Sequence, residues 1–159
     1  MMIFGKKLSE YVRFQRIILG LIVVLGLARL FLSLAGVPND AVKFVSLTVV
    51  GLAGVFYYGI RVHTSGFGSY KHLLPLLVIQ NVLTHTIIIA GIVIARLTQQ
   101  PNIFSAPEYG GTMGARAHVL GHVAIGMIGF SLVGWLVASV VMWVTKRVSP
   151  RGQQQPATT

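Results

Sequence analysis

Four long apolar segments, separated by shorter polar ones, account for most of the hydrophobic positions along this chain. They cover residues 17–36, 44–60, 73–95 and 119–144. A helix needs about 20 apolar residues to cross a hydrocarbon core about 30 Å thick, and each segment reaches or approaches that length. No stretch of about ten residues alternates polar and apolar side chains as a transmembrane strand does. The pattern therefore predicts an all-α integral membrane protein with four transmembrane helices.

The connections between these segments are short enough to predict antiparallel neighbours and an up-down four-helix bundle. Residues 1–148 would form this single transmembrane domain, and the polar residues 149–159 would form a disordered tail. The segment 97–117 is the longest connection and contains Pro101, Pro107 and three glycines. Connections of that length usually have a function or are disordered. The sequence leaves its role open.

Composition and charge agree with a membrane protein. The chain is 54% hydrophobic and 10% charged, and its mean hydropathy of +0.76 excludes a soluble globular domain. The net charge of +10 could indicate a nucleic-acid-binding protein. However, the basic residues flank the apolar segments instead of forming one stripe, so we expect the lipid bilayer and not nucleic acid as their partner.

The same basic residues predict the orientation. Nine of the Lys and Arg residues fall on the side of the membrane that has both chain termini and the second connection, and three fall on the other side. The excess of Lys and Arg places both termini in the cytoplasm of a multi-pass protein of the cell (plasma or inner) membrane. A cleaved signal peptide is the alternative for the first segment, because small residues at Ser33 and Ala35 follow an apolar run. Arg29 interrupts the approach to that site.

Arg29 is the one basic residue inside an apolar segment. An arginine at the centre of a membrane helix costs about 2.5–3.5 kcal/mol, so such a residue normally faces a partner or a wet cavity. Two interpretations remain open: a structural polar residue that reaches phosphates or helix carbonyls, or a member of an ion pair or anion site. We expect Arg29 to point into the bundle with Glu108 as its acidic partner.

The third segment has polar residues at its middle, among them Asn81 and His85, which lie four residues apart on one helix face. We interpret Asn81 as a structural polar residue, and a buried histidine beside it most often makes a hydrogen bond between helices. A haem or metal ligand, a proton relay and a quinone contact are the functional alternatives for His85.

The fourth segment begins with His118 and His122, which also share one helix face. Two imidazoles in this arrangement can bind one metal ion, and Glu108 in the preceding connection could be the third ligand. Glycines at 126 and 129 continue the same face and predict free room beyond the histidines. Val119 stands where a zinc protease would have its catalytic glutamate, so that class is excluded. The alternative is a pair that bonds carbonyls and lipid head groups.

The depth of the histidines bears on any shared ligand. At about 1.5 Å per residue, His85 falls within about 2 Å of the membrane midplane and His122 about 13 Å from it. One haem held by both residues is therefore not expected. Met127 lies nearer the depth of His85, so a haem b between His85 and Met127 is the alternative.

No pattern of a nucleophilic triad, a phosphate loop or paired catalytic carboxylates occurs, and the chain has no cysteine. We therefore expect no enzyme, but a non-catalytic subunit or accessory protein of a membrane complex. Its partners would be other membrane subunits or further copies of itself. The alternative function is a redox or quinone-linked protein that binds haem or a divalent metal through histidines on the non-cytoplasmic side.

Overall fold

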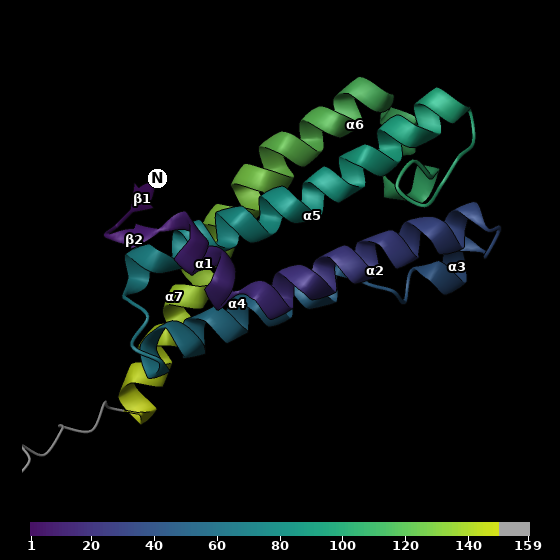
Figure 1. Ribbon diagram of the computed structural model, residues 1–159. Helices are drawn as coiled ribbons and strands as arrows, with labels where there is room; N and C mark the ends of the chain where they lie inside the picture. Colours follow the sequence, from purple (N-terminus) through teal and green to yellow (C-terminus); the bar gives the residue numbers. More distant parts are fainter. Residues whose placement is uncertain (150–159) are drawn as a thin grey trace, which may run out of the picture.

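The computed structural model describes residues 1–149, and the tail predicted for residues 149–159 lies almost entirely outside them. Helices make up nearly all of this part of the chain (Figure 1). The elements are β1 (Met2–Ile3), β2 (Lys6–Lys7), α1 (Leu8–Phe14), α2 (Arg16–Leu34), α3 (Asn39–Val42), α4 (Leu47–Thr64), α5 (Tyr70–Thr98), η1 (Pro107–Tyr109), η2 (Gly111–Met113), α6 (Ala115–Gly121), η3 (His122–Gly129) and α7 (Phe130–Val148).

Four helical segments are long and apolar enough to cross a membrane. They are Arg16–Leu34, Asn39–Thr64, Tyr70–Thr98 and Ala115–Val148. The four predicted helices are therefore confirmed. The last three extend beyond the predicted apolar segments at both ends, because these spans include polar residues near their ends.

The long helices run alternately in opposite directions, and α4 packs along α7 while α5 contacts both α2 and α7 (Figure 1). Small residues permit the closest approach. A Cβ atom on Gly59 of α4 would lie 2.7 Å from Val141 Cβ and 2.8 Å from the Ala138 carbonyl oxygen of α7. Glycine at such positions lets two membrane helices meet backbone to backbone.

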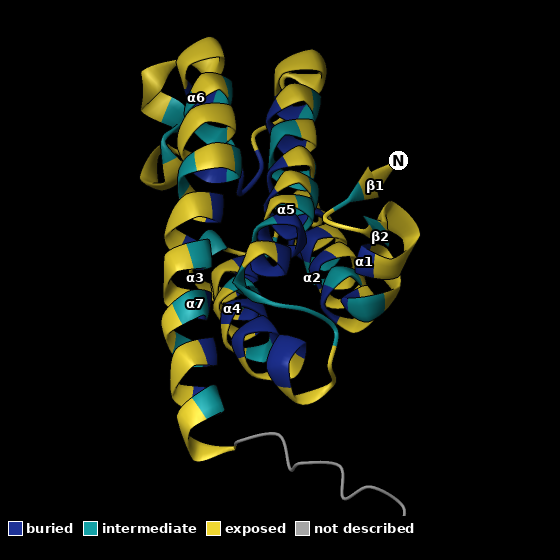
Figure 2. Cartoon of the chain, turned by 90° about the vertical axis from the view of Figure 1, so that its left-hand side faces the viewer, coloured by how far each residue is buried: buried dark blue, intermediate teal, exposed yellow. Residues whose placement is uncertain are grey.

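Apolar side chains cover the outside of the bundle as well as its interior. Figure 2 shows exposed residues along the outward sides of the helices and buried ones facing inward. Leu52, Ile125 and Leu136 are each more than half exposed. A soluble monomer rarely exposes so much continuous apolar surface, whereas lipid is a suitable solvent for it.

An N-terminal arm that was not predicted packs on the start of α5. Residues 2–7 form a hairpin, and the Tyr11 hydroxyl donates to the Ile3 carbonyl at 3.0 Å. The Lys7 backbone N–H donates to the Glu10 carboxylate at 2.7 Å, which satisfies one free donor at the start of α1. This hydrogen bond is the main reason that the pKa of Glu10 lies below its ordinary value.

The long connection between α5 and α6 folds back into the bundle. Ile103 and Phe104 are buried, and the Asn102 side chain donates to the Gly91 carbonyl of α5 at 2.7 Å. The Phe104 ring occupies the space where a side chain on Gly91 would be. This segment lies where α2 and α5 diverge (Figure 1). As a result α6 packs beside α5.

Candidate functional site

Three histidines from two separate segments of the chain form a continuous row. His85 Nδ1 of α5 lies 3.0 Å from His122 Nδ1, the first residue of η3. His122 Nε2 lies 3.1 Å from His118 Nε2, one turn earlier in α6. Both separations are hydrogen-bond distances between ring nitrogens. We call these residues the histidine chain.

The depth argument that separated His85 from His122 is wrong. His85 is 13 residues from the end of α5, about 20 Å, whereas His122 is seven residues from the start of α6, about 10 Å. The connection between α5 and α6 folds back along the bundle, and this offsets the difference between the two distances. Asn81, which the sequence analysis treats as a structural polar residue, donates from Nδ2 to the Ser131 hydroxyl of α7 at 3.1 Å.

Glycine and a widened helix make the contact with His85 possible. The His85 ring packs on the backbone of Gly126, where a Cβ atom would lie only 2.5 Å from His85 Nδ1. The free room that the glycines predicted at this position is thus filled by the protein itself. Residues His122–Gly129 form a π-helix, a rare conformation that often occurs at functional sites.

The histidine chain differs from a three-ligand metal centre. His122 directs its two ring nitrogens to two different neighbours, and those nitrogens point in divergent directions, so the three rings do not converge. Glu108, the predicted third ligand, instead accepts a hydrogen bond from Asn39 Nδ2 at 3.0 Å. Within residues 1–149 no group of three or more His, Asp or Glu side chains is arranged to hold a metal ion.

The predicted haem site between His85 and Met127 stays a prediction. The Met127 carbonyl accepts the Ser131 hydroxyl, and the ring of Phe130 lies 5.9 Å from that of His85. His85 already uses one ring nitrogen for His122.

Two cavities border the histidine chain. His118 lines one of about 330 Å³, together with Arg96 and Ser105. His118 is 4% exposed, and its Nδ1 atom has no hydrogen-bond partner within the described residues. His122 lines the second cavity, of about 270 Å³, which Arg29 also lines. The histidine chain therefore borders a cavity at two of its three residues, His118 and His122.

Arg29 is buried, with 9% of its surface exposed. Its guanidinium lies 5.1 Å from the ring centre of Tyr109 and 5.6 Å from that of Phe104, and Nη1 is 3.4 Å from the Val45 carbonyl oxygen. The predicted ion pair with Glu108 is wrong, since that carboxylate is exposed and bonded to Asn39. Aromatic faces, not an acid, surround this cation.

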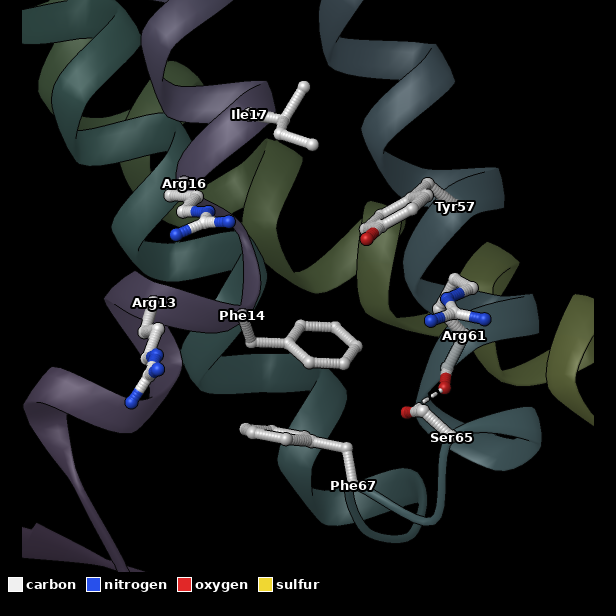
Figure 3. A pocket seen from close by; sticks show the side chains of 8 residues that line it. All are labelled: Arg13, Phe14, Arg16, Ile17, Tyr57, Arg61, Ser65 and Phe67. Atoms are coloured by element: carbon white, nitrogen blue, oxygen red, sulfur yellow. Dashed lines mark hydrogen bonds between the residues drawn. The ribbon is translucent and has the colours of Figure 1, made fainter.

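A further polar hollow of about 440 Å³, which the sequence interpretation missed, lies at the opposite end of the bundle (Figure 3). Arg13, Arg16 and Arg61 line it, and the ring centres of Phe14 and Phe67 lie 4.1 Å apart with their planes tilted by 31°. The only sequence signal was the general excess of basic residues at this end. We call it the arginine hollow.

Known proteins supply no further guide to the site. No family model, curated protein or solved structure matches this chain.

Proposed function

We propose that this protein is a multi-pass subunit of a membrane complex, in which the histidine chain passes protons between a cavity near one end of the bundle and the middle of the membrane. One observation carries this proposal: two consecutive imidazole contacts, at 3.0 and 3.1 Å, lead from the buried His85 to a histidine that lines a cavity. A neutral imidazole has one donor and one acceptor nitrogen, so a row of them can pass a proton along.

The transfer balances when each ring begins with one proton. In this scheme His118 Nδ1, which is buried without a hydrogen-bond partner, takes a proton that arrives from the cavity lined by His118. The proton on His118 Nε2 then moves to His122 Nε2, and the proton on His122 Nδ1 moves to His85 Nδ1. His85 becomes the imidazolium. His118 and His122 each keep one proton but change tautomer, so a second transfer requires these two rings to return to their first state.

The path ends inside the bundle, which favours a subunit over an independent proton carrier. His85 is the sixteenth of the 29 residues of α5, close to the middle of that helix. Within residues 1–149, no hydrogen bond extends the histidine chain from His85 toward the end of the bundle that has the arginine hollow. A proton delivered to mid-membrane is useful only when another molecule accepts it there. We expect that acceptor to be a neighbouring subunit of the complex or its cofactor.

Imidazole exchange measured by nitrogen NMR tests the relay. In vesicles of the labelled protein, the His85 ring proton should exchange with water at least tenfold more slowly in His122→Gln than in the unaltered chain. His72→Gln is the matched control, because His72 contacts the N-terminal arm at the opposite end. An exchange rate at His85 that does not depend on His122 would refute the relay.

The orientation is part of the same proposal. The excess of basic residues supports cytoplasmic termini in the cell membrane, with the histidine cavities on the other side. Because the chain has no cysteine, single cysteines at Ser65 and Thr112 can be labelled without a background. We expect an impermeant reagent to reach position 112 from outside intact cells and position 65 only after lysis. Equal labelling of both positions from outside would contradict this topology.

Metal binding is the second candidate, and one distance favours it. The Nε2 atoms of His118 and His122 are 3.1 Å apart. Two nitrogens bound at about 2.1 Å to a tetrahedral ion lie roughly 3.4 Å apart, so a small movement would allow both to bind one divalent metal. Elemental analysis and an absorption spectrum of the purified protein test this. A stoichiometric metal that is absent from His118→Ala would replace the relay with a metal centre.

A further inference from the structure

Arg29 has a charge that the surrounding protein does not neutralise. Its Nε atom is buried without a hydrogen-bond partner, its hydrogen bond to the Val45 carbonyl is long at 3.4 Å, and its other polar partner, the Tyr109 side chain, is an uncharged hydroxyl. No acidic side chain lines the cavity into which it faces. A buried cation without a counter-charge is strongly unfavourable, so an anion is the missing part of this arrangement.

Hydrogen-bond donors from three helical segments surround the same cavity. Besides Arg29 of α2, the lining includes Lys43, Ser46 and Thr48 near the start of α4, and Tyr109 of η1. Lys43 is matched by Asp40 at 2.8 Å, so its charge is already balanced. The Ser46 hydroxyl accepts from the Val49 backbone N–H, which leaves its own proton free to donate. We call this space the Arg29 cavity.

We propose that the Arg29 cavity binds a phosphate group, held mainly by the Arg29 guanidinium and by the hydroxyls beside it. A planar guanidinium offers two parallel N–H groups to a phosphate, and hydroxyls on another side can reach the remaining oxygens. The rings of Phe104 and Tyr109 hold the guanidinium from two directions. The volume of about 270 Å³ leaves room for a phosphate and part of what it is attached to.

The position of the cavity allows two sources of that phosphate. Arg29 lies five residues, about 8 Å, from the end of α2, so a lipid head group at this surface could reach it. A free phosphate ion from the water on that side could enter as well. Both sources offer the same chemistry. His122 of the histidine chain also lines this cavity, but the charge that defines the site belongs to Arg29 and not to a histidine.

Binding of two probes to the full-length protein in detergent tests the site. Inorganic phosphate is titrated by calorimetry, and phosphatidylglycerol is counted by native mass spectrometry. Arg29→Gln is compared with Arg116→Gln, which removes an exposed arginine from the same end of the bundle. All variants contain Arg16→Gln, so that the arginine hollow contributes less. We expect at least tenfold weaker binding in Arg29→Gln and less than a twofold change in Arg116→Gln.

The outcomes are distinct. Phosphatidylglycerol binding that needs Arg29 assigns the phosphate to a lipid, and inorganic phosphate binding that needs Arg29 assigns it to a soluble ion. Binding of neither probe, or binding that Arg29→Gln leaves unchanged, overturns the proposal. If Arg29→Gln does not fold, as checked by circular dichroism, Thr48→Val must show the weaker binding in its place. Phosphate binding should stay unchanged in His85→Gln, which interrupts the relay at a residue outside the lining of the Arg29 cavity and so separates the two sites.

Discussion

Replacing Gly126 by alanine should break the histidine chain without altering any histidine. The added Cβ atom would lie 2.5 Å from Nδ1 and 2.6 Å from Nε2 of His85. Ordinary contact begins at 3.4 Å, so the ring must move by about 0.9 Å. A movement of that size away from η3 extends the His85–His122 separation from 3.0 Å beyond the roughly 3.5 Å at which a hydrogen bond is lost.

The free-energy cost follows from two terms. Overpacking of a close contact costs about 1–3 kcal/mol. Loss of one hydrogen bond adds about 0.5–1.5 kcal/mol. Gly→Ala in a helix also gains up to about 1 kcal/mol from helix propensity, which Gly121→Ala would gain equally. A side chain at Gly121 meets nothing within 4 Å, so this substitution is the matched control. We expect Gly126→Ala to unfold about 1.5–4.5 kcal/mol more easily than Gly121→Ala.

Reversible unfolding in mixed SDS micelles, followed by circular dichroism, measures this difference. The exchange of the His85 ring proton is recorded in the same samples and should slow at least tenfold in Gly126→Ala alone. Equal unfolding midpoints for the two variants would show that the His85 ring does not pack on Gly126. Equal midpoints together with equal exchange rates would show that packing at Gly126 does not hold His85 against His122.

Three more predictions concern other parts of the bundle. A double-mutant cycle of Asn81→Ala and Ser131→Ala should give a coupling of about 0.6–1.7 kcal/mol in SDS unfolding, as hydrogen bonds between membrane helices do, and additive effects would contradict the bond. Asn102→Ala should release the connection between α5 and α6, seen as faster proteolysis within residues 99–114, while the rate of the unaltered chain stays low. The backbone N–H of Lys7 lowers the pKa of the Glu10 carboxyl below its ordinary value of 4.5. The Glu10 carboxylate therefore stabilises the N-terminal arm fully above pH 4.5, and this stabilisation is lost as the pH falls through the lower pKa of the folded state. Amide exchange in the arm should therefore rise in acid, and Glu10→Gln should abolish that pH dependence.

The sequence by itself determined the number and type of the main elements. Insertion into lipid depends on the length and apolarity of each segment, which are local properties, so the four helices could be predicted one at a time. The separation of His118 and His122 by one helical turn was equally local. The identity of the buried polar residues was visible too, because a residue such as Arg29 within an apolar segment is conspicuous without any structure.

Only the tertiary structure decided which of these residues meet. Helix length alone could not give the relative depth of α5 and α6, because the connection between them turns back to bury Ile103 and Phe104. That return brings His85 to His122, and it carries Glu108 to Asn39 instead of to Arg29. Contacts between distant segments depend on how side chains fill the space between helices, as Phe104 fills the space at Gly91. No periodicity in a single segment records that packing.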